Sequence, residues 1–143
     1  MGVKGITLSS KDDRLVGMLL IKREGTTVLV ATEKGFGKRT EISQYRAQKR
    51  GGKGVLTMKT TDKVGKMVTI KEVVDKDDLM IITNQGVLIR QPVSQIRAIG
   101  RATQGVKLIK LGEGTLVSSI TRIMSEEDDG DENNSAEPEG SSE

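Results

Sequence analysis

Residues 28–59 read VLVATEKGFGKRTEISQYRAQKRGGKGVLTMK, and residues 79–110, 51 positions later, read LMIITNQGVLIRQPVSQIRAIGRATQGVKLIK. The two segments align without a gap and place glycine on glycine and arginine on arginine. These pairs are Gly35 with Gly86, Arg39 with Arg90, Arg46 with Arg97, Arg50 with Arg101, and Gly54 with Gly105. A further copy starts at Gly2 and Val3, which match Gly54 and Val55. Units of this length in a β-rich chain predict a propeller-type or solenoid array.

Each copy consists of short apolar runs divided by turns, and we interpret the runs as β-strands. The expected strands are residues 3–8, 15–22, 27–32, 37–40, 55–60, 67–74, 79–83, 87–91, 106–111 and 116–124. Gly35 and Gly86 end tight hairpin turns, where glycine supplies a positive φ. No stretch has a helical period, and we expect residues 41–48 to form a loop or one turn. The chain is therefore predicted to be all-β, with repeat units at about 2–53 and 54–104 and last strands in 105–124.

The composition excludes several kinds of enzyme. The chain has no His and no Cys, so histidine triads, thiol chemistry and disulfides are excluded. The G-x4-G-K-[ST] phosphate loop is absent, and the paired aspartates 12–13 and 77–78 fall in predicted turns. We expect no catalytic and no metal-ligating residue. Because the chain has neither a signal peptide nor an apolar run of bilayer length, a soluble, cytoplasmic protein without membrane contact is expected.

The net charge of +3 conceals a segregation of charge along the chain. Residues 126–143 hold nine acidic residues and no Lys or Arg, so residues 1–125 hold 23 basic and 11 acidic residues, an excess of 12 positive charges. This excess of positive charge in residues 1–125 predicts a polyanionic partner. We expect residues 125–143 to form a disordered acidic tail. One interpretation is that this tail competes with the partner for the basic surface.

Basic residues recur at the same place in each unit, in the segment that joins the second strand of the hairpin to the next strand. They are Lys38, Arg39, Arg46, Lys49, Arg50, Lys53, Arg90, Arg97, Arg101 and Lys107. A periodic basic surface suits the regular phosphate spacing of duplex DNA and reads no bases. Stacking on single strands is disfavoured because Phe36 and Tyr45 are the only aromatic residues. Ile96 occupies the position of Tyr45 in the next unit, so we interpret Tyr45 as a packing residue and not as a nucleophile.

These segments resemble the C-terminal domain of the A subunit of bacterial DNA gyrase. Residues 35–40, GFGKRT, are similar to that family's GYGKRT hairpin, and residues 100–106, GRATQGV, to its GRxTQGV strand entry. Residues 48–54, QKRGGKG, fit the gyrase box Q(K/R)RGG(K/R)G at all seven positions. The box adds further residues to the candidate DNA contacts: Gln48, Gly51, Gly52 and Gly54.

The resemblance implies a β-pinwheel of four-stranded blades whose basic rim binds and wraps DNA without sequence preference. In such a domain the wrap supports ATP-dependent negative supercoiling. The implied partners are the rest of the gyrase A subunit, together with the gyrase B subunit, in a heterotetramer. ATP and Mg²⁺ serve the holoenzyme, and no cofactor is expected on this chain. With about two to two and a half blades, the chain is interpreted as the last third of such a domain. Residues 48–54 are then either the box itself or the equivalent loop of a late blade.

Two alternatives to this family remain. The C-terminal domain of topoisomerase IV is similar but lacks the intact box. An RNA- or ribosome-binding β-barrel would also have a basic, glycine-rich composition, but a single barrel does not explain a repeat of 51 residues.

Overall fold

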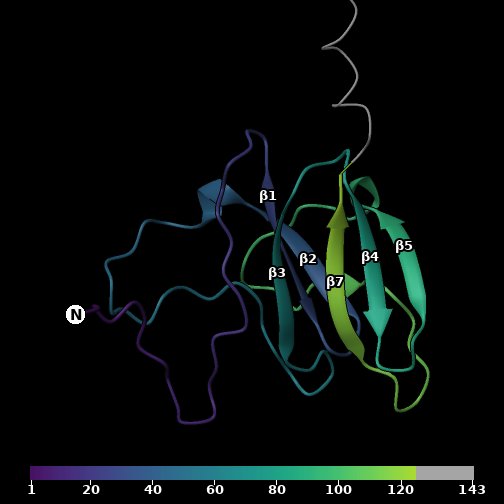
Figure 1. Cartoon of the computed structure of the whole chain (residues 1–143), viewed down its shortest axis with the longest axis horizontal. Helices are drawn as coiled ribbons and strands as arrows, with labels where there is room; N and C mark the ends of the chain where they lie inside the picture. The colour runs from purple at the N-terminus through teal and green to yellow at the C-terminus, as the bar shows by residue number, and fades with distance from the viewer. Residues whose placement is uncertain (125–143) are drawn as a thin grey trace, which may run out of the picture.

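The structure is a computed structural model, and it describes residues 1–124. The described residues contain seven β-strands and two 3-10 helices (Figure 1). Their bounds are β1 Thr27–Thr32, β2 Phe36–Glu41, η1 Ile42–Gln44, β3 Met67–Val73, β4 Asp78–Thr83, β5 Leu88–Pro92, η2 Val93–Gln95, β6 Val106–Lys107 and β7 Val117–Ile123. The all-β prediction is confirmed. The acidic tail and its predicted disorder lie outside the described residues.

The strands form two antiparallel sheets that repeat one plan. The first sheet has the order β3-β1-β2-β6, and the second has the order β5-β4-β7. Each sheet contains a hairpin, β1–β2 or β4–β5. The first strand of this hairpin also pairs, on its other side, with a later strand, β3 or β7. Both of these pairings carry a register irregularity, after Ala31 in β1 and after Ile82 in β4, which lie 51 residues apart. The sequence repeat is thus also a repeat of strand pairing.

The first sheet takes its fourth strand, β6, from residues 105–124, the segment after the second unit. β6 pairs with β2, so that Phe36 faces Lys107 and Gly37 faces Val106. Ile99 also donates its backbone N–H to the carbonyl oxygen of Arg39, at 2.8 Å. Neighbouring units are therefore joined by backbone hydrogen bonds as well as by packing. In the described residues β5 pairs only with β4.

The core is aliphatic and lies between the two sheets. Leu29 of β1, Ile81 of β4 and Ile120 of β7 belong to one buried cluster. The opposite face of β1 is also covered, because Val28 and Val30 pack with Met58 in a second cluster. β1 is buried at all six positions, which explains why it has a continuous apolar run instead of an alternating one. Each fully buried Val or Leu stabilises the fold by roughly 1.5–3 kcal/mol.

Three of the predicted strands do not form. Residues 3–8, 15–22 and 55–60 are extended or irregular and have no strand partner, and β6 covers only two of the six residues predicted for it. Figure 1 shows the first residues as a purple trace that leaves the sheets. Their apolar side chains are correspondingly exposed, for example Met18 at 92% and Leu20 at 69%. An apolar run becomes a strand only where another strand offers backbone groups beside it.

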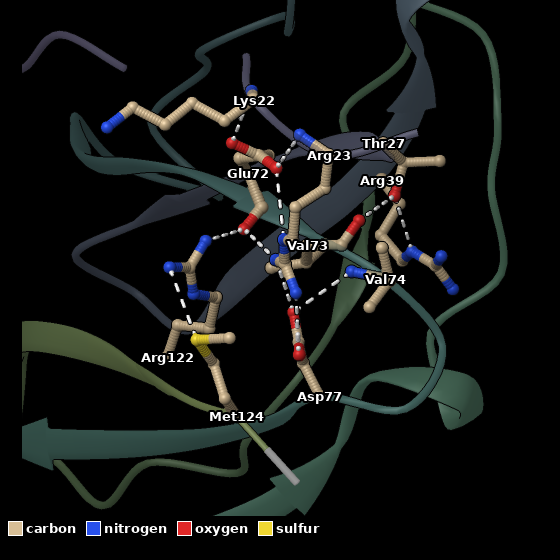
Figure 2. A network of polar contacts seen from close by, with 10 residues as sticks. All are labelled: Lys22, Arg23, Thr27, Arg39, Glu72, Val73, Val74, Asp77, Arg122 and Met124. Carbon is tan, nitrogen blue, oxygen red and sulfur yellow. Dashed lines mark hydrogen bonds and ion pairs between the residues drawn. The ribbon is translucent and has the colours of Figure 1, made fainter. Parts of the chain in front are cut away.

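A polar network attaches the end of this extended segment to the folded body (Figure 2). The guanidinium of Arg23 forms ion pairs with Glu72 at 3.1 Å and with Asp77 at 2.7 Å, and both carboxylates are buried. Burial alone disfavours ionisation of Asp77, but hydrogen bonds from Arg23 and from the Val74 N–H outweigh it and lower the pKa of Asp77. Arg122 of β7 donates to the carbonyl oxygen of Glu72 at 2.9 Å. The network therefore joins residues 22–23 to β3, to the turn between β3 and β4, and to β7.

Candidate nucleic-acid interface

Two loops carry most of the predicted DNA contacts, and they occupy equivalent places in the two units. The first-unit loop, residues 45–54, follows η1, and the second-unit loop, residues 96–107, follows η2. Both 3-10 helices are followed by an extended residue, Tyr45 or Ile96, whose N–H closes the turn. The basic side chains of the loops that the structure leaves exposed are Arg46, Lys49, Arg50, Lys53, Arg97 and Lys107.

The two loops are neighbours in space. The guanidinium of Arg101 donates to the carbonyl oxygen of Leu56 at 2.7 Å and lies 6.0 Å from the ring centroid of Tyr45. The hydroxyl of Tyr45 is in turn hydrogen bonded to Thr57. Arg101 is therefore partly engaged inside the protein, and it brings the second-unit loop against the end of the first-unit loop. The two loops therefore meet at this contact.

Lys38 lies inside the protein, although the sequence placed it among the phosphate contacts. Its side chain is fully buried. The ammonium group donates to the carbonyl oxygen of Gly100 at 2.8 Å, to that of Arg101 and to Thr103 Oγ1 at 3.2 Å. Burial, with the nearby charge of Arg101 as a smaller cause, lowers the pKa of Lys38 to about 8. Lys38 holds the backbone of the second-unit loop and offers nothing to a phosphate.

Arg39 is also turned inward. Its side chain is about 8% exposed, and its Nε donates to Thr27 Oγ1 at 2.9 Å. One terminal nitrogen donates to the carbonyl oxygens of Val93 at 3.3 Å and Ile96 at 3.0 Å. Arg39 thus ties β2 of the first unit to η2 of the second. The sequence could not separate this arginine from exposed ones, because spacing says nothing about which way a side chain points.

Arg90 and Lys107, two further predicted basic residues, each lie close to one neighbouring side chain. Arg90 is exposed on β5, and its Nε contacts the carboxylate of Asp78 at 2.7 Å. The ammonium of Lys107 lies 5.8 Å from the ring centroid of Phe36. Lys63 approaches the same ring at 5.8 Å, so it places another cation beside the second-unit loop. Lys63 was not among the predicted contacts because it lies in a turn outside the repeated basic segment.

Residues 48–54 dock on the start of the chain in the way that the second-unit loop docks on the segment near Lys59. Gly51 donates to the carbonyl oxygen of Gly5 at 2.9 Å, and Thr7 donates to that of Gly52 at 2.8 Å. In the second unit, Lys59 donates to the carbonyl oxygen of Thr103 at 2.9 Å.

The glycines give the turn at residues 48–54 its shape. Gly51 and Gly54 have φ values of 78° and 80°, a region that favours glycine. Gln48, Gly52 and Gly54 are exposed, and Gly51 is half-buried. Three of the four residues that the gyrase box adds to the candidate contacts, Gln48, Gly52 and Gly54, are therefore accessible to a ligand.

The chain matches the family described as "DNA gyrase C-terminal domain, beta-propeller" over residues 1–22, 26–73 and 77–123. It belongs to this family. The family resemblance predicted from the repeat and from residues 48–54 is thereby confirmed, and the RNA-binding barrel is excluded.

Relatives of this gyrase C-terminal domain chain include the A subunit of DNA gyrase from Staphylococcus epidermidis (strain ATCC 12228 / FDA PCI 1200), 48% identical over 128 residues. Another is the A subunit of DNA gyrase from Staphylococcus aureus (strain MRSA252), 45% identical over 132 residues. These alignments cover 89% and 92% of this chain but only 14% and 15% of the relatives. The chain therefore spans about one seventh of the length of the curated relatives it matches.

Two solved structures show the same fold at 22% sequence identity. The C-terminal domain of DNA topoisomerase IV has a TM-score of 0.77, with 85% of this chain and 38% of that chain covered. The DNA gyrase A C-terminal domain has a TM-score of 0.64, with 68% and 33% covered. The gyrase C-terminal domain chain is thus a partial propeller-like array, as its repeat predicted.

In residues 1–124 no group of three or more His, Cys, Asp or Glu residues is arranged to hold a metal ion. Within the same part of the chain, no helix has the length and apolar character to cross a membrane. The polar groups that the two loops expose are ammonium, guanidinium and amide groups, which bind anions.

Proposed function

We propose that this chain binds the backbone of duplex DNA through the first-unit and second-unit loops, without reading the base sequence. The observation that carries the proposal is that the two loops meet around Arg101 and Tyr45 and together carry six exposed cations. Each cation that neutralises a phosphate releases counterions, and this release does not depend on the base sequence. The family membership of the chain supports the same conclusion.

The relatives that the chain resembles support a role within a larger enzyme. We propose that the chain is the DNA-wrapping part of a gyrase A subunit, working with the remainder of that protein and with the gyrase B subunit. In this role it supports negative supercoiling without making or breaking a bond itself. ATP and Mg²⁺ then act on other parts of the holoenzyme, and the site of action is bacterial DNA in the cytoplasm.

The test is salt-dependent binding of the full chain to unrelated DNA duplexes of equal length. Arg50→Ala should weaken binding to every duplex by a similar factor and reduce the slope of log K against log salt by about 0.9. Lys22→Ala removes an exposed lysine outside both loops and serves as the matched control, with an unchanged slope. A loss of affinity for only some of the duplexes would contradict backbone binding.

Wrapping can be measured separately. A nicked plasmid is sealed by ligase in the presence of the chain, and the linking number of the product is read on a gel. A wrap of fixed hand shifts the distribution in one direction in proportion to the bound protein. Binding without any shift would retain the DNA-binding proposal and reject the wrapping role.

A further inference from the structure

Strand β2 holds the second-unit loop at both of its ends. At one end, β6 pairs with β2. At the other end, the Arg39 carbonyl oxygen accepts the N–H of Ile99 at 2.8 Å. The turn of residues 100–103 lies between these two attachments, and the β2 side chain that reaches this turn is Lys38. Lys38 therefore contacts the part of the loop that the two backbone attachments leave unsupported.

The turn of residues 100–103 is folded around the Lys38 ammonium group. This group donates to the carbonyl oxygens of Gly100 at 2.8 Å, of Arg101, and of Thr103 at 3.4 Å. It also donates to Thr103 Oγ1 at 3.2 Å. An ammonium has three N–H groups and no acceptor, and carbonyl oxygens that converge on one point form a cation site. The turn is thus closed by a positive charge that belongs to β2.

The charge at position 38 serves the turn and not the hairpin. The equivalent residue of the β4–β5 hairpin, 51 positions later, is Ile89, so this type of hairpin accepts an apolar side chain there. Lys38 is fully buried, and burial of an ammonium is costly unless polar groups surround it. In residues 1–124 no carboxylate forms an ion pair with Lys38. The carbonyl groups of the turn are therefore its compensation.

The same turn carries the side chain that joins the two basic loops. The guanidinium of Arg101 donates to the Leu56 carbonyl oxygen at 2.7 Å and lies 6.0 Å from the Tyr45 ring centroid. If the turn opens, Arg101 moves with it and this contact with the end of the first-unit loop is lost. Cations that are held in place before binding lose less conformational entropy when they contact phosphates. The closed turn therefore favours DNA binding by both loops.

The proton on Lys38 controls whether the turn can close in this way. Burial, with the charge of Arg101 as a smaller cause, lowers the pKa of Lys38 to about 8. The charged group that faces Lys38 is the Arg101 guanidinium, and Tyr45 lies on the other side of Arg101, with its hydroxyl bound to Thr57. A neutral amine has two N–H groups and a lone pair, and the lone pair repels the carbonyl oxygens. Loss of the proton therefore removes the cation on which the turn is folded.

We propose that Lys38 is a positioning residue for DNA binding, because its ammonium group closes the turn of residues 100–103 and so fixes Arg101 between the two basic loops. This inference rests on the proposed binding of duplex DNA by these loops. Lys38 itself contacts no phosphate. Because the protonated form holds the loops in place, it binds DNA more tightly than the neutral form, and DNA affinity falls as Lys38 loses its proton.

The test is the affinity of the full chain for one labelled duplex, measured by fluorescence anisotropy from about pH 7 to about pH 9 at about 0.15 M salt. Wild-type affinity should fall roughly three- to tenfold over this range. Lys38→Met should bind at least roughly fivefold more weakly at pH 7 and show no such fall. Lys22→Met removes an exposed lysine outside both loops and is the matched control, with the wild-type profile. These variants share every other titratable group, so their difference reports Lys38.

A variant that keeps the net charge separates positioning from simple electrostatic attraction. Thr103→Val removes one acceptor from around the Lys38 ammonium, so the charged form is held less well and the fall in affinity should move to lower pH. Thr121→Val makes the same chemical change at an exposed position on β7 and should leave the profile unchanged. If Lys38 acted only through its charge, Thr103→Val would keep the wild-type profile, and that result would overturn the proposal.

The outcomes also distinguish this inference from the proposed function. A wild-type chain that binds DNA equally well at pH 7 and pH 9 overturns the positioning role and leaves DNA binding intact. A chain that binds no duplex at pH 7 rejects the proposed function and this inference with it. Circular dichroism at pH 7 shows whether Lys38→Met is folded. If it is unfolded, the wild-type profile and the profile of Thr103→Val decide between the outcomes.

Discussion

Replacing Arg39 by Met should destabilise the protein while leaving its DNA contacts in place. The side chain makes hydrogen bonds to Thr27, Val93 and Ile96 from a buried position. Its ion pair with Asp75 adds little, because that carboxylate is 76% exposed and a surface pair contributes at most about 1 kcal/mol. Met fills a similar volume but leaves the Ile96 carbonyl group without the Arg39 donor, whereas the Val93 carbonyl group still accepts from the Ile96 N–H. A buried acceptor that loses its donor costs about 1–3 kcal/mol.

The expected loss of about 1–3 kcal/mol in the free energy of unfolding leaves the protein folded. A folded body of 124 residues has a free energy of unfolding of roughly 6–19 kcal/mol. The chain lacks Trp and has two aromatic residues, so the assay is urea unfolding followed by far-UV circular dichroism. Arg46→Met is the matched control: Arg46 is exposed, and surface substitutions change stability by about 0.5 kcal/mol or less.

The salt dependence of DNA binding should change in Arg46→Met and not in Arg39→Met, whereas stability should change in Arg39→Met and not in Arg46→Met. Below the unfolding transition, Arg39→Met should keep the wild-type salt slope, whereas Arg46→Met should lower the slope by about 0.9. If Arg39→Met lost the slope and kept its stability, the inward position of this side chain would not describe the protein in solution.

Three further outcomes are expected. Because hydrogen bonds hold the pKa of Asp77 below its ordinary value of 3.8, its contribution to stability is present above about pH 4 and is lost as the pH falls further; Asp77→Asn should remove this loss from acid unfolding curves. Burial lowers the pKa of Lys38 from 10.5 to about 8. Between these pH values the unfolded chain binds more protons than the folded chain, so the free energy of unfolding should rise with pH. Lys38→Met should flatten this rise, and NMR titration of the Lys38 side chain should give a midpoint near pH 8. Deleting residues 126–143 removes nine acidic residues and should tighten DNA binding at low salt if the tail competes for the basic loops; an unchanged affinity would reject that competition.

The hairpins could be predicted from local information alone. The strand expected at residues 27–32 coincides with β1, and the one at 79–83 differs from β4 by one residue. Apolar β-branched runs ending in a glycine turn specify a hairpin because both strands and the turn lie within one short segment. The strands expected at residues 3–8, 15–22 and 55–60 failed for the converse reason, since a strand needs a partner that local sequence does not supply.

The candidate site, like the strands, was predicted correctly only in part. Arg46, Lys49 and Arg50 are exposed, as the basic composition of their loop predicts. Lys38 and Arg39 lie close to them in the sequence but point into the interior, where they bind carbonyl groups of the following unit. The network around Arg23 carried no repeated signal, because its members come from segments about 50 residues apart and have no counterpart in the other unit.

The sequence by itself determined the 51-residue repeat, the all-β character, the family and the presence of a strong positive charge. These properties depend on composition and on spacing along the chain, which the sequence states directly. Only the tertiary structure decided which cations face solvent, that the two basic loops adjoin, and that a cavity lies between residues 10–16 and 55–67. The reason is physical: burial and contact depend on the segments that fold against a residue, and those segments belong to other units of the repeat.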